Sequence, residues 1–154
     1  MARKTTMPTS TARKSNKVFV DTGGWFAVAA EDDKYHQVAV RYFEAQLKSG
    51  TRFLTSDYVL DETLTRLRYD LGHRAAFRFW QQIESARNKS ILDILRVDEE
   101  IFSLALNIFA RFEDQKFSFT DCTSFALAQS RTVEEVFTFD AHFAIFGLVV
   151  RPIP

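Results

Sequence analysis

Two acidic residues come directly after runs that are typical of buried strands. Asp21 follows Lys17-Val18-Phe19-Val20, and Asp140 follows Val136-Phe137-Thr138-Phe139. Both runs are short, β-branched and aromatic, which favours strands covered on both faces. Because open parallel sheets carry their sites beyond the carboxyl ends of the strands, we expect both carboxylates at one edge of a sheet.

Two further acids stand near the starts of predicted helices. Asp121 lies in the first turn after Ser118, and Glu62 lies one turn into the helix that follows Ser56. If both helices start at the same edge of the sheet, four carboxylates converge there. Such a group cannot remain fully ionised without a cation, because like charges at short range repel strongly. Hard oxygen ligands at this density suit Mg²⁺ or Mn²⁺, so the pattern predicts a divalent metal site.

Three of these acids also have a purely structural interpretation as helix caps. Asp21 and Asp140 could each accept hydrogen bonds from the first turn of the helix that follows. Ser118 and Asp121 have the Ser-x-x-Asp spacing of a capping box, with Asp in place of the usual Glu. The sequence leaves both interpretations open for all three residues.

Glu62 has a structural alternative of another kind. Arg66 follows four residues later, so the two side chains could form an ion pair on a solvated helix face. The neighbouring Asp61 competes with Glu62 for an inward position. Helical spacing does not choose between these two acids.

The elements that must position the acids alternate along the chain. Short apolar runs predict strands over residues 17–20, 52–55, 91–97 and 136–139, with a last run at 148–150. Helical spacing predicts helices over 25–30, 35–48, 56–71, 74–87, 98–112 and 118–131, and a final turn over 140–146. Strands that alternate with helices predict an α/β domain, with helices on both faces of a parallel sheet of four or five strands.

The charge of the chain is unevenly distributed, although its formal net charge is zero. Residues 1–17 hold five of the 20 basic residues and no acid, which leaves 15 basic against 20 acidic residues in the rest. A uniformly basic nucleic-acid surface on the folded part is therefore not expected.

Residues 1–16 are rich in Ser, Thr, Lys and Arg, which predicts a flexible basic arm before one domain over residues 17–154. The 16 Phe residues predict an aromatic core.

The order and the surroundings of the four acids resemble those of the PIN-domain ribonucleases, and most closely the VapC-type toxins of bacterial and archaeal toxin-antitoxin pairs. The resemblance covers residues 17–151. It rests on four segments, which are Val18-Phe19-Val20-Asp21-Thr22, then Thr55-Ser56 with Val59 and Glu62, then Phe117-Ser118-Phe119-Thr120-Asp121-Cys122, and last Phe137-Thr138-Phe139-Asp140 with Phe143. It implies a PIN-like three-layer α/β/α sandwich with a short-stranded, mainly parallel central sheet.

The resemblance also implies an activity, that of an endoribonuclease that needs Mg²⁺ or Mn²⁺ and hydrolyses RNA phosphodiester bonds. Water as the attacking group, in place of the RNA 2′-OH, would leave 5′-phosphate and 3′-OH ends. The implied partners are a small antitoxin protein and a second copy of the chain in a homodimer. The implied catalytic and metal-binding acids are Asp21, Glu62, Asp121 and Asp140, and the supporting hydroxyl groups are those of Thr22 and Thr120.

Other residues are candidates for contacts with RNA. The side chains of Lys34, Arg66 and Arg68 could bind the phosphate backbone, and each could equally be an ordinary surface charge. Tyr35 and Trp25 could stack on unpaired bases, which is how single-stranded RNA is usually read, or could pack in the core.

The histidines and the single cysteine favour no alternative chemistry. The three histidines are far apart in the sequence and have no metal-ligand or acid-base spacing. His142, two residues after Asp140, is expected at the surface although it could touch the site. Cys122 is expected to be a small buried thiol that does not act as a nucleophile.

Two other functions remain open. The chain could be a non-catalytic PIN-like domain that binds RNA or protein, although the presence of all four acids speaks against this. It could also be a solitary RNA-processing nuclease without an antitoxin. Phosphatases are disfavoured because Asp21-Thr22-Gly23 lacks the second acid of their Asp-x-Asp motif. No apolar run is long enough for a membrane span, so a cytoplasmic protein without membrane partners is expected.

Overall fold

The computed structural model describes residues 16–154, so the predicted basic arm over residues 1–16 lies outside the described residues except for Asn16. The Asn16 carbonyl accepts a hydrogen bond from the backbone N–H of Arg52 at 2.8 Å, and its side chain donates to the Ser49 carbonyl. Asn16 is therefore tied to the segment that enters the second strand.

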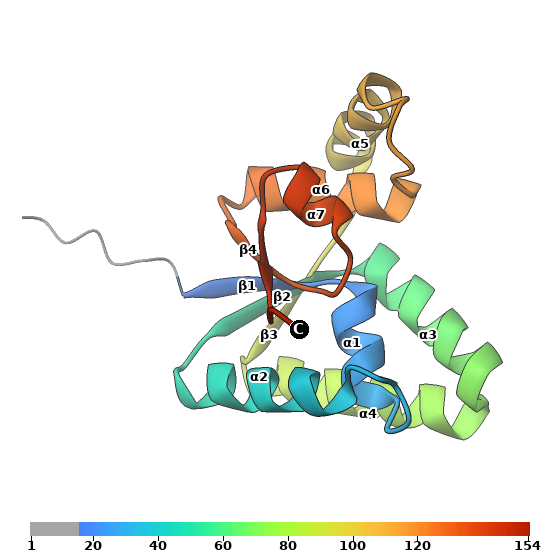
Figure 1. The fold of residues 1–154 in the computed structure, drawn as a ribbon, viewed down its shortest axis with the longest axis vertical. Coiled ribbons are helices and arrows are strands. Elements are labelled where there is room, and N and C mark those ends of the chain that lie inside the picture. Colours follow the sequence, from blue (N-terminus) through green and yellow to red (C-terminus); the bar gives the residue numbers. More distant parts are fainter. Residues whose placement is uncertain (1–15) are drawn as a thin grey trace, which may run out of the picture.

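Five strands and seven helices alternate along the described chain (Figure 1). Within residues 16–154, no helix is long and apolar enough to cross a membrane. The strands are β1 (Lys17–Val20), β2 (Arg52–Ser56), β3 (Leu92–Leu95), β4 (Glu135–Phe137) and β5 (Val149–Arg151). The helices are α1 (Thr22–Ala29), α2 (His36–Lys48), α3 (Asp57–Leu71), α4 (His73–Asn88), α5 (Glu99–Arg111), α6 (Phe119–Ser130) and α7 (His142–Ile145).

The sheet has its strands in the order β3-β2-β1-β4-β5, and every neighbouring pair is parallel. The central strand β1 pairs with β2 on one side and with β4 on the other. Its residues Val18, Phe19 and Val20 are at most 3% exposed, because helices cover both faces of the sheet. The predicted sheet is thus confirmed.

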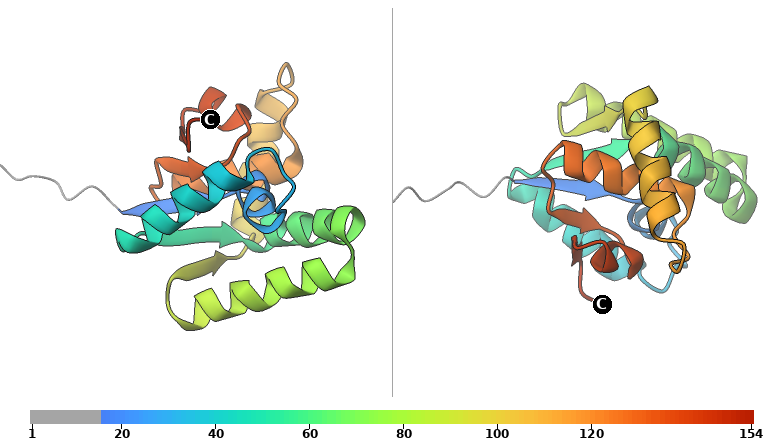
Figure 2. Two further views of the ribbon diagram at one scale, coloured as in Figure 1. Left: turned by 60° about the horizontal axis from the view of Figure 1, so that its bottom comes forward. Right: turned by 90° about the horizontal axis from the view of Figure 1, so that it is seen from above.

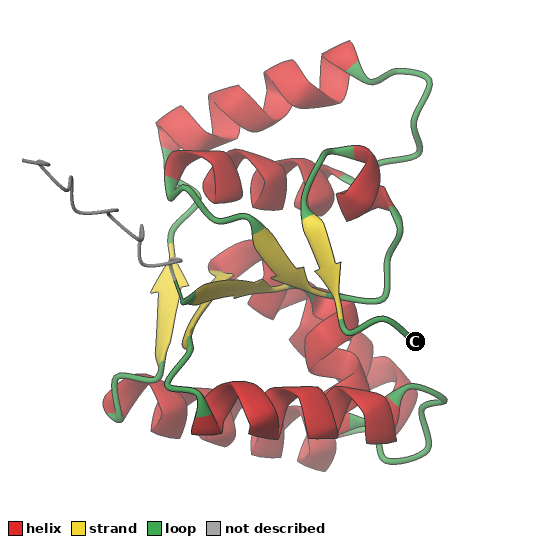
Figure 3. Cartoon of the chain, turned by 60° about the vertical axis from the view of Figure 1, so that its left-hand side comes forward, coloured by secondary structure: helices red, strands yellow, loops and turns green. Residues whose placement is uncertain are grey.

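The helices form two layers, one on each face of the sheet (Figures 1 and 3). Helices α1 to α4, which connect β1 to β2 and β2 to β3, lie on one face, and α5 to α7 lie on the other. Figure 2 shows α3 and α4 side by side as a helical hairpin. This is the predicted three-layer α/β/α sandwich.

The direction of the strand order changes between β1 and β4. The chain runs from β1 outward to β2 and β3, and then crosses the sheet to reach β4 and β5. The carboxyl ends of β1 and β4 therefore form the topological switch point, which is where open α/β sheets bind their ligands. Asp21 and Asp140 come after these two strands.

The core is aromatic, as predicted. Phe19, Phe53, Phe125 and Phe137 are among the largest side chains that are less than 2% exposed. Phe125 also stacks on the ring of Phe146, with ring centroids 4.3 Å apart. On the other face, Phe43 of α2 packs on Phe53, with ring centroids 4.8 Å apart, so aromatic rings from both helical layers contribute to the core.

Two predicted boundaries at the carboxyl edge were wrong. Helix α1 begins at Thr22 and not at Trp25, so the two glycines belong to its first turn. A Cβ atom on Gly24 would lie 2.5 Å from the carbonyl oxygen of Phe137, so this glycine permits a close approach of α1 to β4. Strand β4 ends at Phe137, two residues earlier than predicted, and the hydroxyl of Thr138, the next residue, donates to Asp21.

Candidate active site

The four acids predicted from the sequence line one pocket at the carboxyl edge of the sheet, with a volume of about 510 Å³. Asp21 precedes α1, Glu62 lies in the second turn of α3, Asp121 lies in the first turn of α6, and Asp140 follows β4. The predicted convergence is therefore observed. The catalytic role of each acid stays a prediction.

Asp21 is the most enclosed of the four acids, with 5% of its surface exposed. Its Oδ2 atom accepts hydrogen bonds from the Thr138 hydroxyl at 3.0 Å and from the Gly23 N–H at 3.4 Å. Its buried Oδ1 atom has no hydrogen-bond partner among residues 16–154. Burial and the nearby Asp121 carboxylate raise the pKa of Asp21 to about 7, although the hydrogen bonds from Thr138 and the backbone act against this shift.

Asp121 is 8% exposed and belongs to a capping box at the start of α6. Its Oδ2 atom accepts a hydrogen bond from the Ser118 N–H at 3.0 Å, while the Ser118 hydroxyl accepts one from the Asp121 N–H at 3.0 Å. Burial raises the pKa of Asp121, and the Asp140 and Glu62 carboxylates act in the same direction. The hydrogen bonds from Ser118 oppose this rise.

The capping interpretation is correct for Asp21 and Asp121, whereas the N-cap residue of α7 is Ala141 and not Asp140. Asp21 caps α1, Asp121 completes the capping box of α6, and Asp140 accepts the His142 N–H at 2.9 Å. In each case one carboxylate oxygen serves the backbone while the side chain lines the pocket. The caps fix the directions of the acids.

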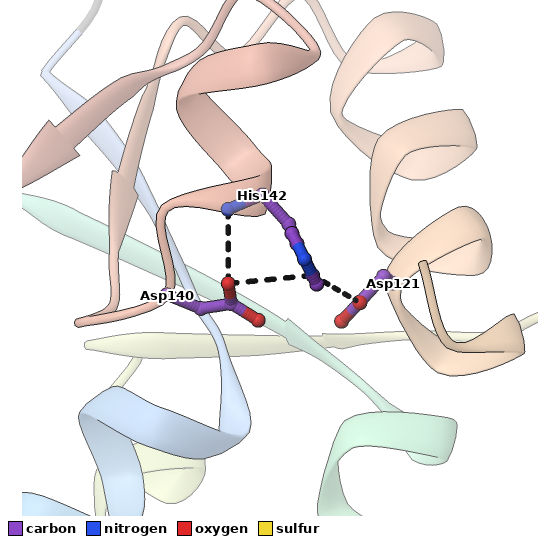
Figure 4. A group of neighbouring side chains, drawn as sticks. All are labelled: Asp121, Asp140 and His142. Atoms are coloured by element: carbon purple, nitrogen blue, oxygen red, sulfur yellow. Dashed lines mark hydrogen bonds and ion pairs between the residues drawn. The ribbon is translucent and has the colours of Figure 1, made fainter. Parts of the chain in front are cut away.

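His142 lies between two of the acids, which corrects the prediction that it belongs to the surface. Its Nδ1 atom is 3.4 Å from Oδ1 of Asp140 and 3.6 Å from Oδ2 of Asp121 (Figure 4). The ring packs edge-on against Phe117, with centroids 5.3 Å apart. Its spacing from Asp140, two residues in the chain, was the available signal, but the sequence did not show that Asp121 would meet it.

The donor set of the pocket fits a divalent cation. Four acids line the pocket, a buried oxygen of Asp21 has no partner among the described residues, and the pKa values of Asp21 and Asp121 are raised. No Lys or Arg side chain among the described residues forms an ion pair with any of the four acids. Ligand atoms of Asp121, Asp140 and His142 lie within 4.8 Å of one another. Carboxylate oxygens at this density are the ligands that Mg²⁺ and Mn²⁺ take in proteins.

Glu62 does not pair with Arg66, so the ion-pair alternative was wrong. The Arg66 guanidinium lies 3.7 Å above the centroid of the Phe26 ring, and its Nε atom is 3.6 Å from a carboxylate oxygen of Asp70. Glu62 is half-buried and lines the pocket, whereas Asp61 is exposed. The structure thus decides between the two acids in favour of Glu62.

Two of the three predicted RNA-binding cations lie at the pocket. Lys34 and Arg66 are exposed and belong to its lining. Arg68 lies elsewhere, in an apolar groove between α3 and α4, where it contacts the ring of His73. Helical geometry explains the difference, because residues two positions apart do not share a face of a helix.

Of the two hydroxyl residues expected near the acids, Thr22 lies at the pocket and Thr120 does not. Thr22 lines the pocket, and its buried Oγ1 atom has no partner among the described residues. Thr120 is half-buried in α6 and is not among the described residues that line the pocket. Thr138 was missed as a functional candidate, although its hydroxyl donates to Asp21 and accepts the Asp140 N–H at 3.1 Å. Its place in a strand run gave no signal of this role.

Of the two aromatic residues predicted to stack on RNA bases, one lies in the core and the other lines the pocket. Trp25 is 4% exposed, and its Nε1 atom donates to the Thr55 hydroxyl at 3.0 Å, so the ring belongs to the core. Tyr35 lines the pocket and stacks on Phe139, with ring centroids 4.3 Å apart. Cys122 is buried, as predicted, and burial raises the pKa of its thiol to about 11.

The fold and the site together define a class, namely α/β domains in which acids from separate elements meet at the switch point of a parallel sheet. Within that class, the family model described as PIN domain matches residues 18–147. The chain belongs to the PIN-domain family, which confirms the resemblance seen in the sequence.

Two related proteins are similar in sequence to most of this chain. A Mycobacterium tuberculosis protein named 23S rRNA-specific endonuclease VapC20 is 31% identical over 136 residues, which cover 88% of this chain and 98% of the relative. A protein of Archaeoglobus fulgidus named VapC ribonuclease is 31% identical over 129 residues, covering 82% of this chain and 78% of the relative.

Two solved structures align with most of this chain. The crystal structure of Mycobacterium tuberculosis VapC20, described as a Sarcin-Ricin loop cleaving toxin, aligns with a TM-score of 0.78 at 30% identity, over 88% of this chain and 99% of that one. The structure of FitAcB from Neisseria gonorrhoeae aligns with a TM-score of 0.65 at 15% identity, over 88% and 96% of the two chains. The second likeness supports the fold alone.

Proposed function

We propose that the protein is a Mg²⁺- or Mn²⁺-dependent endoribonuclease and the toxin of a toxin-antitoxin pair. One observation carries the proposal, which is the pocket where four acids from four elements surround an unpartnered oxygen of Asp21. The relatives named as VapC ribonucleases support it independently.

Each acid has a role in this proposal. Asp21, Asp121 and Asp140 hold the cation, and Glu62 accepts a hydrogen bond from the attacking water. The bound cation neutralises charge on the phosphodiester and makes that water easier to ionise. Thr22, whose hydroxyl is unpartnered among the described residues, donates to an oxygen at the reacting centre.

The reaction in this proposal is hydrolysis. The water oxygen forms a bond to phosphorus, the bond from phosphorus to the 3′ oxygen breaks, and a proton passes to that oxygen. The products carry a 5′-phosphate and a 3′-OH. Lys34 and Arg66, at the pocket, bind the phosphates on either side of the cut.

The proposed partners follow from two surfaces. An Arg or Lys of a small antitoxin would complement the acid pocket. A second copy of the chain would cover α5, where Phe102, Leu106 and Phe109 are 39%, 47% and 51% exposed at helical spacing. A cytoplasmic location fits a protein whose substrate is RNA.

Cleavage of RNA by the purified protein tests the proposal. Because one relative is named for 23S rRNA, that RNA is the first substrate, incubated with Mg²⁺, with Mn²⁺ and with EDTA. A double variant, Asp21→Asn with Asp121→Asn, is compared after circular dichroism has shown that it is folded. Metal-dependent cutting that leaves 5′-phosphate ends and disappears in the variant is the expected result.

Two results would contradict the proposed mechanism. Cutting that survives both EDTA and the two substitutions would exclude the carboxylate mechanism. Products with 2′,3′-cyclic phosphate ends would exclude water as the attacking group. A toxin further requires that co-expression of a small neighbouring gene restores growth, whereas a solitary nuclease does not.

A further inference from the structure

His142 presents a nitrogen atom to the same space as two of the acids. Nδ1 lies 3.4 Å from an oxygen of Asp140 and 3.6 Å from an oxygen of Asp121, and Figure 4 shows the ring between the two carboxylates. The atom is buried, and no group in residues 16–154 forms a hydrogen bond with it. Nδ1 is therefore a third polar atom of the pocket that lacks a partner, in addition to Asp21 Oδ1 and Thr22 Oγ1.

The orientation of the ring is fixed from two sides. The backbone N–H of His142 donates to Oδ1 of Asp140 at 2.9 Å, which ties the start of α7 to that acid. Phe117 packs edge-on against the ring at an interplanar angle of 72°. Because the backbone and the ring are both held, Nδ1 faces the two carboxylates without depending on a salt bridge to do so.

Both separations are within the range of an ion pair, but Nδ1 forms no hydrogen bond with either acid. Charge-assisted N–H to carboxylate hydrogen bonds are about 2.7–2.9 Å long, whereas both separations here are well above that range. An Nδ1 lone pair that points toward two carboxylates is repelled by their negative charge unless a cation lies among the three groups. The arrangement thus suits three donors that share one ion.

The separations also fit a shared ion. Donors at about 2.1 Å from an octahedral ion lie about 3 Å apart when adjacent and about 4.2 Å apart when opposite. The ligand atoms of Asp121, Asp140 and His142 are all within 4.8 Å of one another, which is close to this spacing before any ion draws them in.

We propose that His142 is a nitrogen ligand of the divalent cation, and that it makes the site selective for Mn²⁺ over Mg²⁺. Mg²⁺ takes oxygen ligands almost exclusively, whereas imidazole nitrogen suits transition-metal ions. The proposal rests on the proposed function, because it assumes that the acids bind a cation. It adds to that function a ligand of a different chemical type and a preference for one metal.

A nitrogen ligand of bound Mn²⁺ can be detected directly by spectroscopy. Pulsed electron paramagnetic resonance of the wild-type protein, loaded with one equivalent of Mn²⁺, is expected to show coupling to a directly bound nitrogen. Protein in which only histidine carries ¹⁵N is expected to replace the ¹⁴N coupling by the ¹⁵N coupling. This measurement needs no variant, so it holds even if substitution of His142 prevents folding.

Metal titrations of variants provide the second readout. His142→Ala is expected to weaken Mn²⁺ binding about 10-fold or more and Mg²⁺ binding less than about 3-fold, since only Mn²⁺ gains from the nitrogen. His73→Ala is the matched control, because His73 is exposed on α4 and lies outside the pocket. It is expected to leave both affinities unchanged.

The outcomes separate this inference from the proposed function. Mn²⁺ that binds without histidine coupling, and with equal affinity in wild type and His142→Ala, would overturn the inference and leave the metal-dependent nuclease intact. A wild-type protein that binds neither Mn²⁺ nor Mg²⁺ at millimolar concentration would overturn both. Histidine coupling together with a selective loss of Mn²⁺ affinity supports the inference.

Discussion

The acid pocket has a buried half and an exposed half, and the two are built differently. Asp21 and Asp121 are 5% and 8% exposed, cap the helices that they precede or begin, and have raised pKa values. Glu62 and Asp140 are only half-buried. The buried acids accept backbone hydrogen bonds at an electrostatic cost, whereas the two half-buried acids remain partly hydrated. The buried half is therefore expected to define where a cation binds.

The largest expected difference between the halves is in activity. Asp21→Asn or Asp121→Asn should lower the rate of RNA cleavage by about 10³-fold, because a charge in a water-poor setting acts on the transition state with little screening. Glu62→Gln keeps an oxygen that can accept a hydrogen bond from water, so a loss of about 10-fold is expected. Single-turnover cleavage of 23S rRNA at saturating Mn²⁺ measures all three variants.

Equal losses of cleavage rate in the three variants would show that the buried and the half-buried acids contribute equally to the reaction. In that case burial would have no bearing on function, and the acids would act as one network of equivalent ligands. Thermal unfolding of each variant serves as the control for correct folding.

The second difference is in how stability depends on pH without metal. The pKa of Asp21 is about 7 in the folded protein against 3.8 for the unconstrained side chain, so the folded state retains a proton that the unfolded state has lost between these values. The free energy of unfolding therefore falls as the pH rises from about 4 to 7. Asp21→Asn removes this loss and should stabilise the metal-free protein at pH 8 by about 2–4 kcal/mol, and by less than half as much at pH 5.

Urea unfolding in EDTA at pH 5 and at pH 8 measures this difference. Asp140→Asn is the matched variant in the exposed half, and because it retains Asp21 its stability is expected to fall between the two pH values as it does in the wild type. If Asp21→Asn changed the free energy of unfolding equally at both pH values, ionisation of Asp21 would not be the cause of the pH dependence. Addition of Mn²⁺ at pH 8 should stabilise the wild type more than Asp21→Asn, because only the wild type has the charge that the cation neutralises.

The sequence predicted the buried half of the site better than its surroundings. Strand runs and caps are local features, so Asp21 and Asp121 could be placed at helix starts from their immediate neighbours. The rule that parallel strands bring their carboxyl ends to one edge placed Asp21 beside Asp140, whereas the approach of Asp121 depended on its helix starting at that edge. The sheet, its parallel strands and the layers of helices were predicted on the same grounds.

Contacts between distant segments could not be predicted from the sequence. Thr138 meets Asp21 only because β4 ends at Phe137 and lets its side chain turn inward, and His142 meets Asp121 only because α7 packs beside α6. Both contacts join residues that are far apart in the chain. The extent of β4 was overestimated because Thr138 and Phe139 have strand propensity, which tertiary contacts override.

Thr138 connects the two halves of the pocket, and its removal tests whether they act together. Thr138→Val replaces the hydroxyl that donates to Asp21 and accepts from the Asp140 N–H by a methyl group of similar size. We expect a loss of about 1–3 kcal/mol in stability and a further rise in the pKa of Asp21, because a buried carboxylate loses a donor. Thr138→Ser keeps the hydroxyl and should retain most of the cleavage activity. Equal activity of the Val and Ser variants would mean that the hydroxyl does not position the acids.

The smallest expected effect concerns the rim of the exposed half, where Arg66 and Arg68 differ in position by two residues of α3. Arg66 lines the pocket above the Phe26 ring, whereas Arg68 lies in the groove with His73. Arg66→Ala should raise the KM for RNA about fivefold without changing kcat, since an exposed charge contributes less than about 1 kcal/mol. It should also reduce the dependence of RNA binding on salt by about one counterion, whereas Arg68→Ala should change neither quantity. Fluorescence anisotropy with a labelled RNA fragment across a salt series measures both variants, and an equal effect of the two substitutions would place the RNA over α3 as a whole instead of over the pocket.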